Sequence, residues 1–306
     1  MPARSTFAPA FLAPWLALSA SLAAAALAQP PAGVPAPGSG ASTQSTRPKV
    51  LPRDASVEQI LKIGVPVAPM IMPDGSALVR ERHQGVFQVF RREPGAGPAG
   101  KLTRLTNFAD GVSDVSLSPD GRTLLVEAAR GGSEQTRVYR VDPTKAPAPG
   151  AALPSESDAP LLGPEGVGIT SPTRSVQFSV SSWLKDSSGF FYRANAESTA
   201  DFYLYRYDLA TGQSTPVLKR PGSWSAGMAR RDGSRVLVTR FISASQSECY
   251  ELDIASGTLI DLTLRDDAGE PVASSLVGYL PGEQEVLIVS DYQRGRDGLW
   301  TRPIDG

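Results

Sequence analysis

The sequence predicts an all-β fold, specifically a β-propeller of four-stranded antiparallel blades, and three observations predict it. Glycine and proline are frequent, at 29 and 27 of 306 residues, which favours short strands and turns over helices. Turn-forming tripeptides separate apolar and alternating runs along the chain. These turns recur at a near-constant spacing, which is typical of blades arranged around a common axis.

The repeated turn is clearest in residues 115–127. An alternating run ends at Pro119-Asp120-Gly121, and an apolar run follows at once. Proline fixes φ for the turn, and glycine supplies a positive φ. Counted from the second turn residue, the intervals between turns are 46, 66, 46 and 50 residues, and the long interval contains a Pro/Gly-rich insertion at about 143–172. The other turns are Pro73-Asp74-Gly75, Asp186 to Gly189, Arg231-Asp232-Gly233 and Pro281-Gly282-Glu283.

Each repeat predicts the same four strands. The first precedes the turn, the second follows it, the third alternates and is rich in aromatic residues, and the fourth is short. A sandwich with Greek-key links is the alternative, but a sandwich does not require a fixed period. The predicted strands are 67–72, 77–82, 86–91 and 102–106; 112–118, 123–128, 137–141 and 160–162; 176–184, 190–194, 202–208 and 214–218; 226–229, 235–241, 248–253 and 259–263; and 276–280, 285–290 and 299–304.

The fifth repeat contains three of its four strands before Gly306, so about five blades are present and the last is incomplete. An unfinished ring leaves apolar faces and strand edges exposed. We therefore expect the chain to be a fragment of a longer protein, with ring closure by an unusual route as the alternative.

The first 53 residues predict export. Residues 1–28 combine Arg4, an Ala/Leu-rich run and an Ala26-Leu27-Ala28 cleavage motif, as in a secretory signal peptide. An uncleaved membrane anchor is the alternative. Residues 29–53 are rich in Pro, Gly and Ser and predict a disordered spacer before the propeller at 54–306, which opens with a possible short helix at 54–63. We expect a periplasmic or secreted bacterial protein.

Three stretches of the third and fourth repeats, Ser182–Tyr192, Asp201–Asp208 and Pro221–Ser225, carry a family resemblance. They resemble the N-terminal propeller of prolyl oligopeptidase-family serine peptidases, with bacterial acylaminoacyl-peptidase and dipeptidyl-aminopeptidase-like members the most similar, and Val57–Leu61 resembles their lead-in. The resemblance implies a noncatalytic propeller that gates peptide entry to an α/β-hydrolase domain, which this sequence lacks. Pro-Asp-Gly blades also occur in the propeller of the Tol system, which implies the alternative of a periplasmic module that binds protein or peptide partners.

The sequence predicts no catalytic residue, and we expect the chain alone to hydrolyse no peptide. The stretch Gly222–Gly227 does not have the G-x-S-x-G spacing of a nucleophile elbow. The single histidine, His83, precedes these serines in the chain and lies in a predicted strand. The single cysteine, Cys249, excludes an intrachain disulfide, and its alternating surroundings predict a buried structural residue.

Cofactor and metal sites are not predicted either. Gly95–Gly100 matches G-x-G-x-x-G, but a strand and not a helix follows it. One Cys and one His exclude a usual zinc site, and Asp266–Glu270 does not have calcium-loop spacing. The aromatic run 202–207 predicts sheet packing, since a net charge of −1 argues against a nucleic-acid partner. No membrane contact is predicted beyond the signal peptide.

Overall fold

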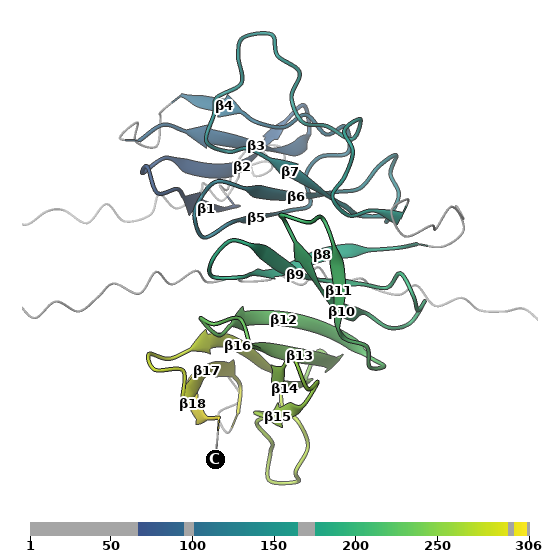
Figure 1. Ribbon diagram of the computed structural model, residues 1–306, viewed down its shortest axis with the longest axis vertical. Coiled ribbons are helices and arrows are strands. Elements are labelled where there is room, and N and C mark those ends of the chain that lie inside the picture. Colours follow the sequence, from purple (N-terminus) through teal and green to yellow (C-terminus); the bar gives the residue numbers. More distant parts are fainter. Residues whose placement is uncertain (1–66, 95–100, 165–174, 293–296, 305–306) are drawn as a thin grey trace, which may run out of the picture. The chain divides into compact units, whose positions relative to one another are not determined.

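The computed structural model describes residues 67–94, 101–164, 175–292 and 297–304, and within them strands β1 to β18 form five antiparallel sheets (Figure 1). Neighbouring strands in each sheet are consecutive in the chain, as in propeller blades. Blade 1 contains β1 (Val67–Ile71), β2 (Ala77–His83), β3 (Val86–Arg92) and β4 (Leu102–Arg104), and blade 2 contains β5 (Asp114–Leu117), β6 (Leu124–Ala128) and β7 (Arg137–Val141). Blade 3 contains β8 (Phe178–Trp183), β9 (Gly189–Ala194), β10 (Tyr203–Asp208) and β11 (Ser214–Leu218). Blade 4 contains β12 (Ser223–Ala229), β13 (Arg235–Ser243), β14 (Gln246–Asp253) and β15 (Leu259–Asp261), and blade 5 contains β16 (Ser274–Tyr279), β17 (Glu285–Ser290) and β18 (Gly298–Pro303).

The predicted β-propeller is confirmed, and most predicted strands differ from the observed ones by one to three residues at an end. The strand expected at 160–162 is reduced to a bridge between Val138 and Leu162, so blade 2 has three strands in the described part of the chain. Pro160 has no amide proton to donate to a sheet ladder, which limits pairing there. Strand β12 begins at Ser223, three residues before the predicted start, because its antiparallel pairing with β13 already includes Ser223 and Phe241. The helix expected at 54–63 lies outside the described residues.

The hydrophobic core lies between consecutive blades. Strand β6 is buried at all five positions, and its side chains alternate between two cores. Leu124 and Val126 pack with residues of blade 1, whereas Leu125 packs with Phe178 and Phe190 of blade 3. A strand that is covered on both faces is largely apolar, which explains the apolar residues of β6 apart from Glu127.

The turn after the first strand of blade 2 is built as its residues predict. Gly121 has a φ of +71°, and a Cβ at this position would lie 2.4 Å from Cδ of Pro73, in the turn of blade 1. The Asp120 carboxylate accepts hydrogen bonds from the Ser118 hydroxyl at 2.6 Å and the Arg122 amide at 3.0 Å. These hydrogen bonds, chiefly that from Ser118, lower the pKa of Asp120. Glycine is therefore required both for its φ and for the close approach of two blades.

The described part of the chain contains no helix that is long and apolar enough to cross a membrane.

Candidate functional site: a polar network at the turns of blades 3 to 5

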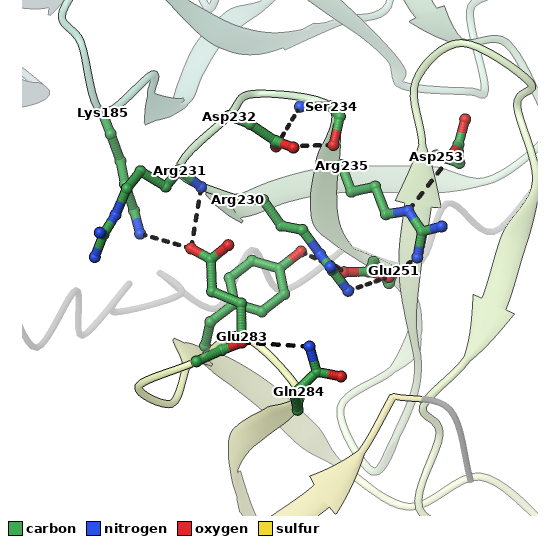
Figure 2. A network of polar contacts seen from close by, with 12 residues as sticks. Lys185, Arg230, Arg231, Asp232, Ser234, Arg235, Glu251, Asp253, Glu283 and Gln284 are labelled. Carbon is green, nitrogen blue, oxygen red and sulfur yellow. Dashed lines mark hydrogen bonds and ion pairs between the residues drawn. The ribbon is translucent and has the colours of Figure 1, made fainter.

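A fully buried carboxylate, Glu251, lies at the centre of a polar network that joins blades 4 and 5 (Figure 2). Nε and Nη2 of Arg230 donate to its two oxygens at 2.7 and 3.2 Å, and Nη1 of Arg235 donates at 3.0 Å. The hydroxyl of Tyr279, at the end of β16, donates to Oε1 at 2.9 Å. The charge of Glu251 is thus compensated by two guanidinium groups and hydrogen bonds, as burial of a carboxylate requires.

The protonation states in this network are fixed by its contacts. Hydrogen bonds to Glu251 raise the pKa of both Arg230 and Arg235. Burial, followed by the charge of Glu251, raises the pKa of the Tyr279 phenol above its usual range. The Tyr279 hydroxyl therefore stays protonated and acts as a donor. Arg230, Arg235 and Tyr279 all donate to Glu251, so this part of the network links blade 4 to blade 5.

The outer part of the network connects three turns. Oε1 of Glu283, in the turn of blade 5, accepts a hydrogen bond from the Arg231 amide of blade 4 at 3.0 Å. The same oxygen lies 3.3 Å from Nζ of Lys185, in the turn of blade 3. Figure 2 shows the side chains of Lys185 and Glu283 directed toward each other, with the Arg231 guanidinium directed away from Glu283. This turn rim, defined as Lys185, Arg231 and Glu283, presents partly exposed charges of both signs.

A second buried carboxyl, Glu127 of β6, lies between blades 2 and 3. Its Oε1 accepts a hydrogen bond from the Val180 amide of β8 at 2.6 Å. Burial raises the pKa of Glu127 to about 8, against the effect of that hydrogen bond, which lowers it. Glu127 is therefore largely protonated near neutral pH.

The sequence analysis did not identify Glu127 or Glu251 as buried charges. Glu127 carried one available signal, because it is the charged residue within an otherwise apolar predicted strand. Glu251 carried none, since its strand alternates polar and apolar residues, and strand periodicity alone does not show that a neighbouring blade covers the polar face.

The serines and the histidine considered for a catalytic site lie in different blades. Ser223 and Ser225 lie within β12, paired with Phe241 and Thr239 of β13, and not on a strand-to-helix turn. His83 ends β2 of blade 1, where its ring lies edge-on to Phe90 with centroids 6.4 Å apart. The structure therefore does not bring the histidine and these serines into one blade.

The other sequence candidates occupy structural positions. Cys249 is buried in β14, and burial raises the pKa of its thiol to about 12. Asp266 folds its own loop, since its carboxylate accepts the amides of Ala268 and Glu270, both at 2.9 Å. Gly95–Gly100 lies outside the described residues. Among residues that the structure describes, no group of three or more His, Cys, Asp or Glu side chains is placed to hold a metal ion.

The aromatic run of the third repeat packs within its blade, as predicted. The Tyr205 ring of β10 stacks on Tyr192 of β9, with centroids 5.1 Å apart and planes at 15°. Tyr207 stacks on Phe190 in the same way, also at 5.1 Å. Both tyrosines are buried, so these rings stabilise the core and do not form an exposed stacking platform.

Comparison with solved structures identifies propellers of two kinds. TolB from Acinetobacter baumannii matches with a TM-score of 0.52 and 17% identity over 79% of this chain. A putative TolB from Agrobacterium tumefaciens matches with a TM-score of 0.51 and 16% identity over 79% of this chain. Prolyl oligopeptidase B from Galerina marginata matches with a TM-score of 0.56 and 14% identity over 79% of this chain. At these identities the comparisons show a shared β-propeller fold. No family model and no curated protein matches the sequence.

The chain spans different shares of these proteins. It covers 53% of the Acinetobacter TolB, 78% of the Agrobacterium protein and 36% of the prolyl oligopeptidase.

Proposed function

We propose that this chain is the noncatalytic propeller of an exported prolyl oligopeptidase-like serine peptidase and limits the access of peptides to a hydrolase domain encoded beyond the printed sequence. Export is part of the proposal and is supported by the signal-like residues 1–28. Acylaminoacyl- or dipeptidyl-aminopeptidase-like members of the family are the kind that the third and fourth repeats most resemble.

One observation carries this proposal: the described blades match the structure of a prolyl oligopeptidase over 79% of this chain but only 36% of the peptidase. The matching part is a propeller, and the motif stretch Ser182–Tyr192 covers the end of β8, the turn after it and most of β9. The turn rim of Lys185, Arg231 and Glu283 adds polar groups that suit contacts with peptide amides and termini.

The coding sequence after Gly306 tests the proposal directly. We expect an open frame that continues through further blades to a G-x-S-x-G elbow, followed by Asp and His. The complete protein should then react with a fluorophosphonate probe, and this chain alone should not. A stop codon directly after Gly306, with no hydrolase domain in the complete protein, would contradict the proposal.

A second candidate is a propeller that binds protein or peptide partners without any hydrolase domain. One specific observation favours it: the chain spans 78% of the length of the putative TolB from Agrobacterium tumefaciens. Under this function, the complete protein should bind a partner stably and show no reaction with the fluorophosphonate probe.

A further inference from the structure

We propose that the outer edge of β7 in blade 2 binds an extended peptide, which adds to the blade as a fourth strand and pairs its backbone with that of Arg140. This site lies within the chain itself, so the inference does not depend on the gating function proposed above. Blades 1, 3 and 4 have a fourth strand, whereas blade 2 has only the bridge between Val138 and Leu162 among the residues that the structure describes.

The backbone groups of Arg140 are unpaired at this edge. Val138 exchanges hydrogen bonds with Leu162, at 2.9 Å from its amide and 3.3 Å to its carbonyl. Backbone groups of successive residues point to opposite edges of a strand, so those of Arg140 face the same outer edge as those of Val138. Strand β6 lies at the other edge, and no described turn or loop residue bonds to the Arg140 amide or carbonyl. The edge therefore offers a donor and an acceptor to an incoming strand.

Blade 3 shows what occupies the corresponding position when the sheet has its fourth strand. Its third strand, β10, contains Tyr-Arg-Tyr-Asp at 205–208, and β7 contains Tyr-Arg-Val-Asp at 139–142. Arg206, the counterpart of Arg140, pairs with Thr215 of the antiparallel strand β11.

Blade 1 has the same pairing. Arg91 lies opposite Leu78, the second residue of β2, as Arg140 lies opposite Leu125, the second residue of β6. Arg91 in turn pairs with Thr103 of the antiparallel strand β4. In blades 1 and 3 an arginine of the third strand is thus paired with a threonine of the fourth. We expect the peptide bound at β7 to run antiparallel and to place a threonine or a similar residue opposite Arg140.

A cleft of about 330 Å³ lies beside this edge. Tyr139 and Arg140 line it on the strand side, and residues 152–154 and 158–159 line it on the other side. Ligand pockets have volumes of about 300 to 1,000 Å³, so the cleft has room for a short segment. The Tyr139 side chain is buried, and the charged lining residues are one arginine and one aspartate, Asp158. Recognition therefore rests on the backbone of the strand edge.

The outer wall of the cleft is held in place without a ligand. The carbonyl of Pro154 accepts a hydrogen bond from the Asn107 amide at 2.8 Å. Oε2 of Glu156 accepts the Ala109 amide at 3.1 Å. Both donors belong to the connection between blades 1 and 2, which thus fixes the loop that faces β7. A preformed slot lowers the cost of ordering a bound strand.

Binding of matched peptides to the purified chain tests this assignment by fluorescence anisotropy. The probe is fluorescein-labelled Leu-Thr-Arg-Leu-Thr-amide, the sequence of residues 102–106. N-methylation of its first threonine removes the amide that would pair with Arg140 and keeps the side chain. This change should weaken binding about tenfold or more. N-methylation of the peptide's arginine, whose amide would point away from β7, is the matched control and should change binding little.

Variants of Arg140 separate its backbone from its side chain. Arg140→Pro removes the edge amide and should weaken binding of the probe about tenfold or more, whereas Arg140→Ala keeps the amide and should bind nearly like the wild type. Thermal unfolding checks the folding of each variant. Arg140→Pro should unfold close to the wild-type temperature, since an edge position accepts proline, and Arg206→Pro should unfold at a lower temperature because β11 covers that edge.

The peptide arm uses the wild-type chain and decides the question even if Arg140→Pro unfolds. Equal binding of the probe and its N-methyl-threonine form, undetectable binding of the probe, or unchanged binding by folded Arg140→Pro would each overturn the assignment. Sedimentation velocity tests the other occupant. A wild-type dimer that is lost in Arg140→Pro would assign this edge to a second copy of the chain and would also overturn the peptide assignment.

Discussion

Replacing Glu127 by glutamine is expected to make the protein more stable at neutral pH and to leave it nearly unchanged in acid. Glu127 lies buried between blades 2 and 3, where its Oε1 accepts the amide of Val180. Glutamine keeps the size of the side chain and an oxygen acceptor for that amide. It removes only the ionisation of the carboxyl, so a pH-dependent difference between the two proteins reports the burial of that charge.

The magnitude follows from the shift in protonation. Burial raises the pKa of Glu127 from 4.5 to about 8, so the folded state binds this proton more tightly than the unfolded state. Between these two pH values the unfolded chain loses the proton and the folded chain keeps it, and stability therefore falls as the pH rises. Each pH unit in this window costs about 1.4 kcal/mol. By pH 7 this effect should have lowered the free energy of unfolding of the wild type by about 3 kcal/mol, and Glu127→Gln should not show this loss.

Urea unfolding of both proteins at half-unit pH steps from 4.5 to 9 measures this difference. The free energy of unfolding of Glu127→Gln relative to the wild type should increase steadily up to about pH 8 and then become constant. Glu134→Gln, which changes an exposed glutamate in the loop after β6, serves as the matched control and should give no such trend. A difference between Glu127→Gln and the wild type that is the same at every pH would refute the reasoning.

Two further substitutions test the turns and the polar network, again by urea unfolding. Gly121→Ala should lower the free energy of unfolding by about 1 to 3 kcal/mol more than Gly85→Ala does. Both glycines have a positive φ, but only at Gly121 would the new Cβ overlap another blade. Equal losses of stability in the two variants would contradict this explanation. Glu251→Gln should lower the free energy of unfolding by about 3 kcal/mol, because it removes the buried counter-charge of Arg230. The control variant Glu285→Gln changes an exposed strand position and should change the free energy of unfolding little. A loss at Glu251 no larger than that at Glu285 would show that the network contributes nothing to stability.

The blades could be predicted from the sequence because their determinants are local. A turn such as Pro119-Asp120-Gly121 specifies its own φ values and hydrogen bonds, and the structure shows both. The strand at 160–162 was overestimated because apolar residues there suggested pairing, whereas Pro160 limits the contact to the Val138 bridge. The residues of a fourth strand do not show by themselves how many of them can pair with the third strand of the same blade.

The candidate sites could not be predicted, because they depend on contacts between blades. Glu283 meets Lys185 although they are 98 residues apart, and nothing in either turn specifies the other. Glu251 of blade 4 likewise accepts a hydrogen bond from Tyr279 of blade 5, and nothing in β14 specifies that partner. A repeat identifies equivalent positions in successive blades, but a site formed by one pair of blades depends on the residues that differ between repeats.

The cores between the blades also differ in side-chain size, although the repeats have nearly equal lengths. Between blades 2 and 3 the core contains five large rings, which are Phe178, Phe190, Tyr192, Tyr205 and Tyr207. Between blades 4 and 5 the fully buried residues are smaller and aliphatic, apart from Cys249. Because protein interiors are close-packed, a junction that holds buried rings does not accept smaller aliphatic side chains without leaving cavities. The core residues are thus fitted to their own junction, and exchanging them between junctions would destabilise the blades even with every turn sequence unchanged.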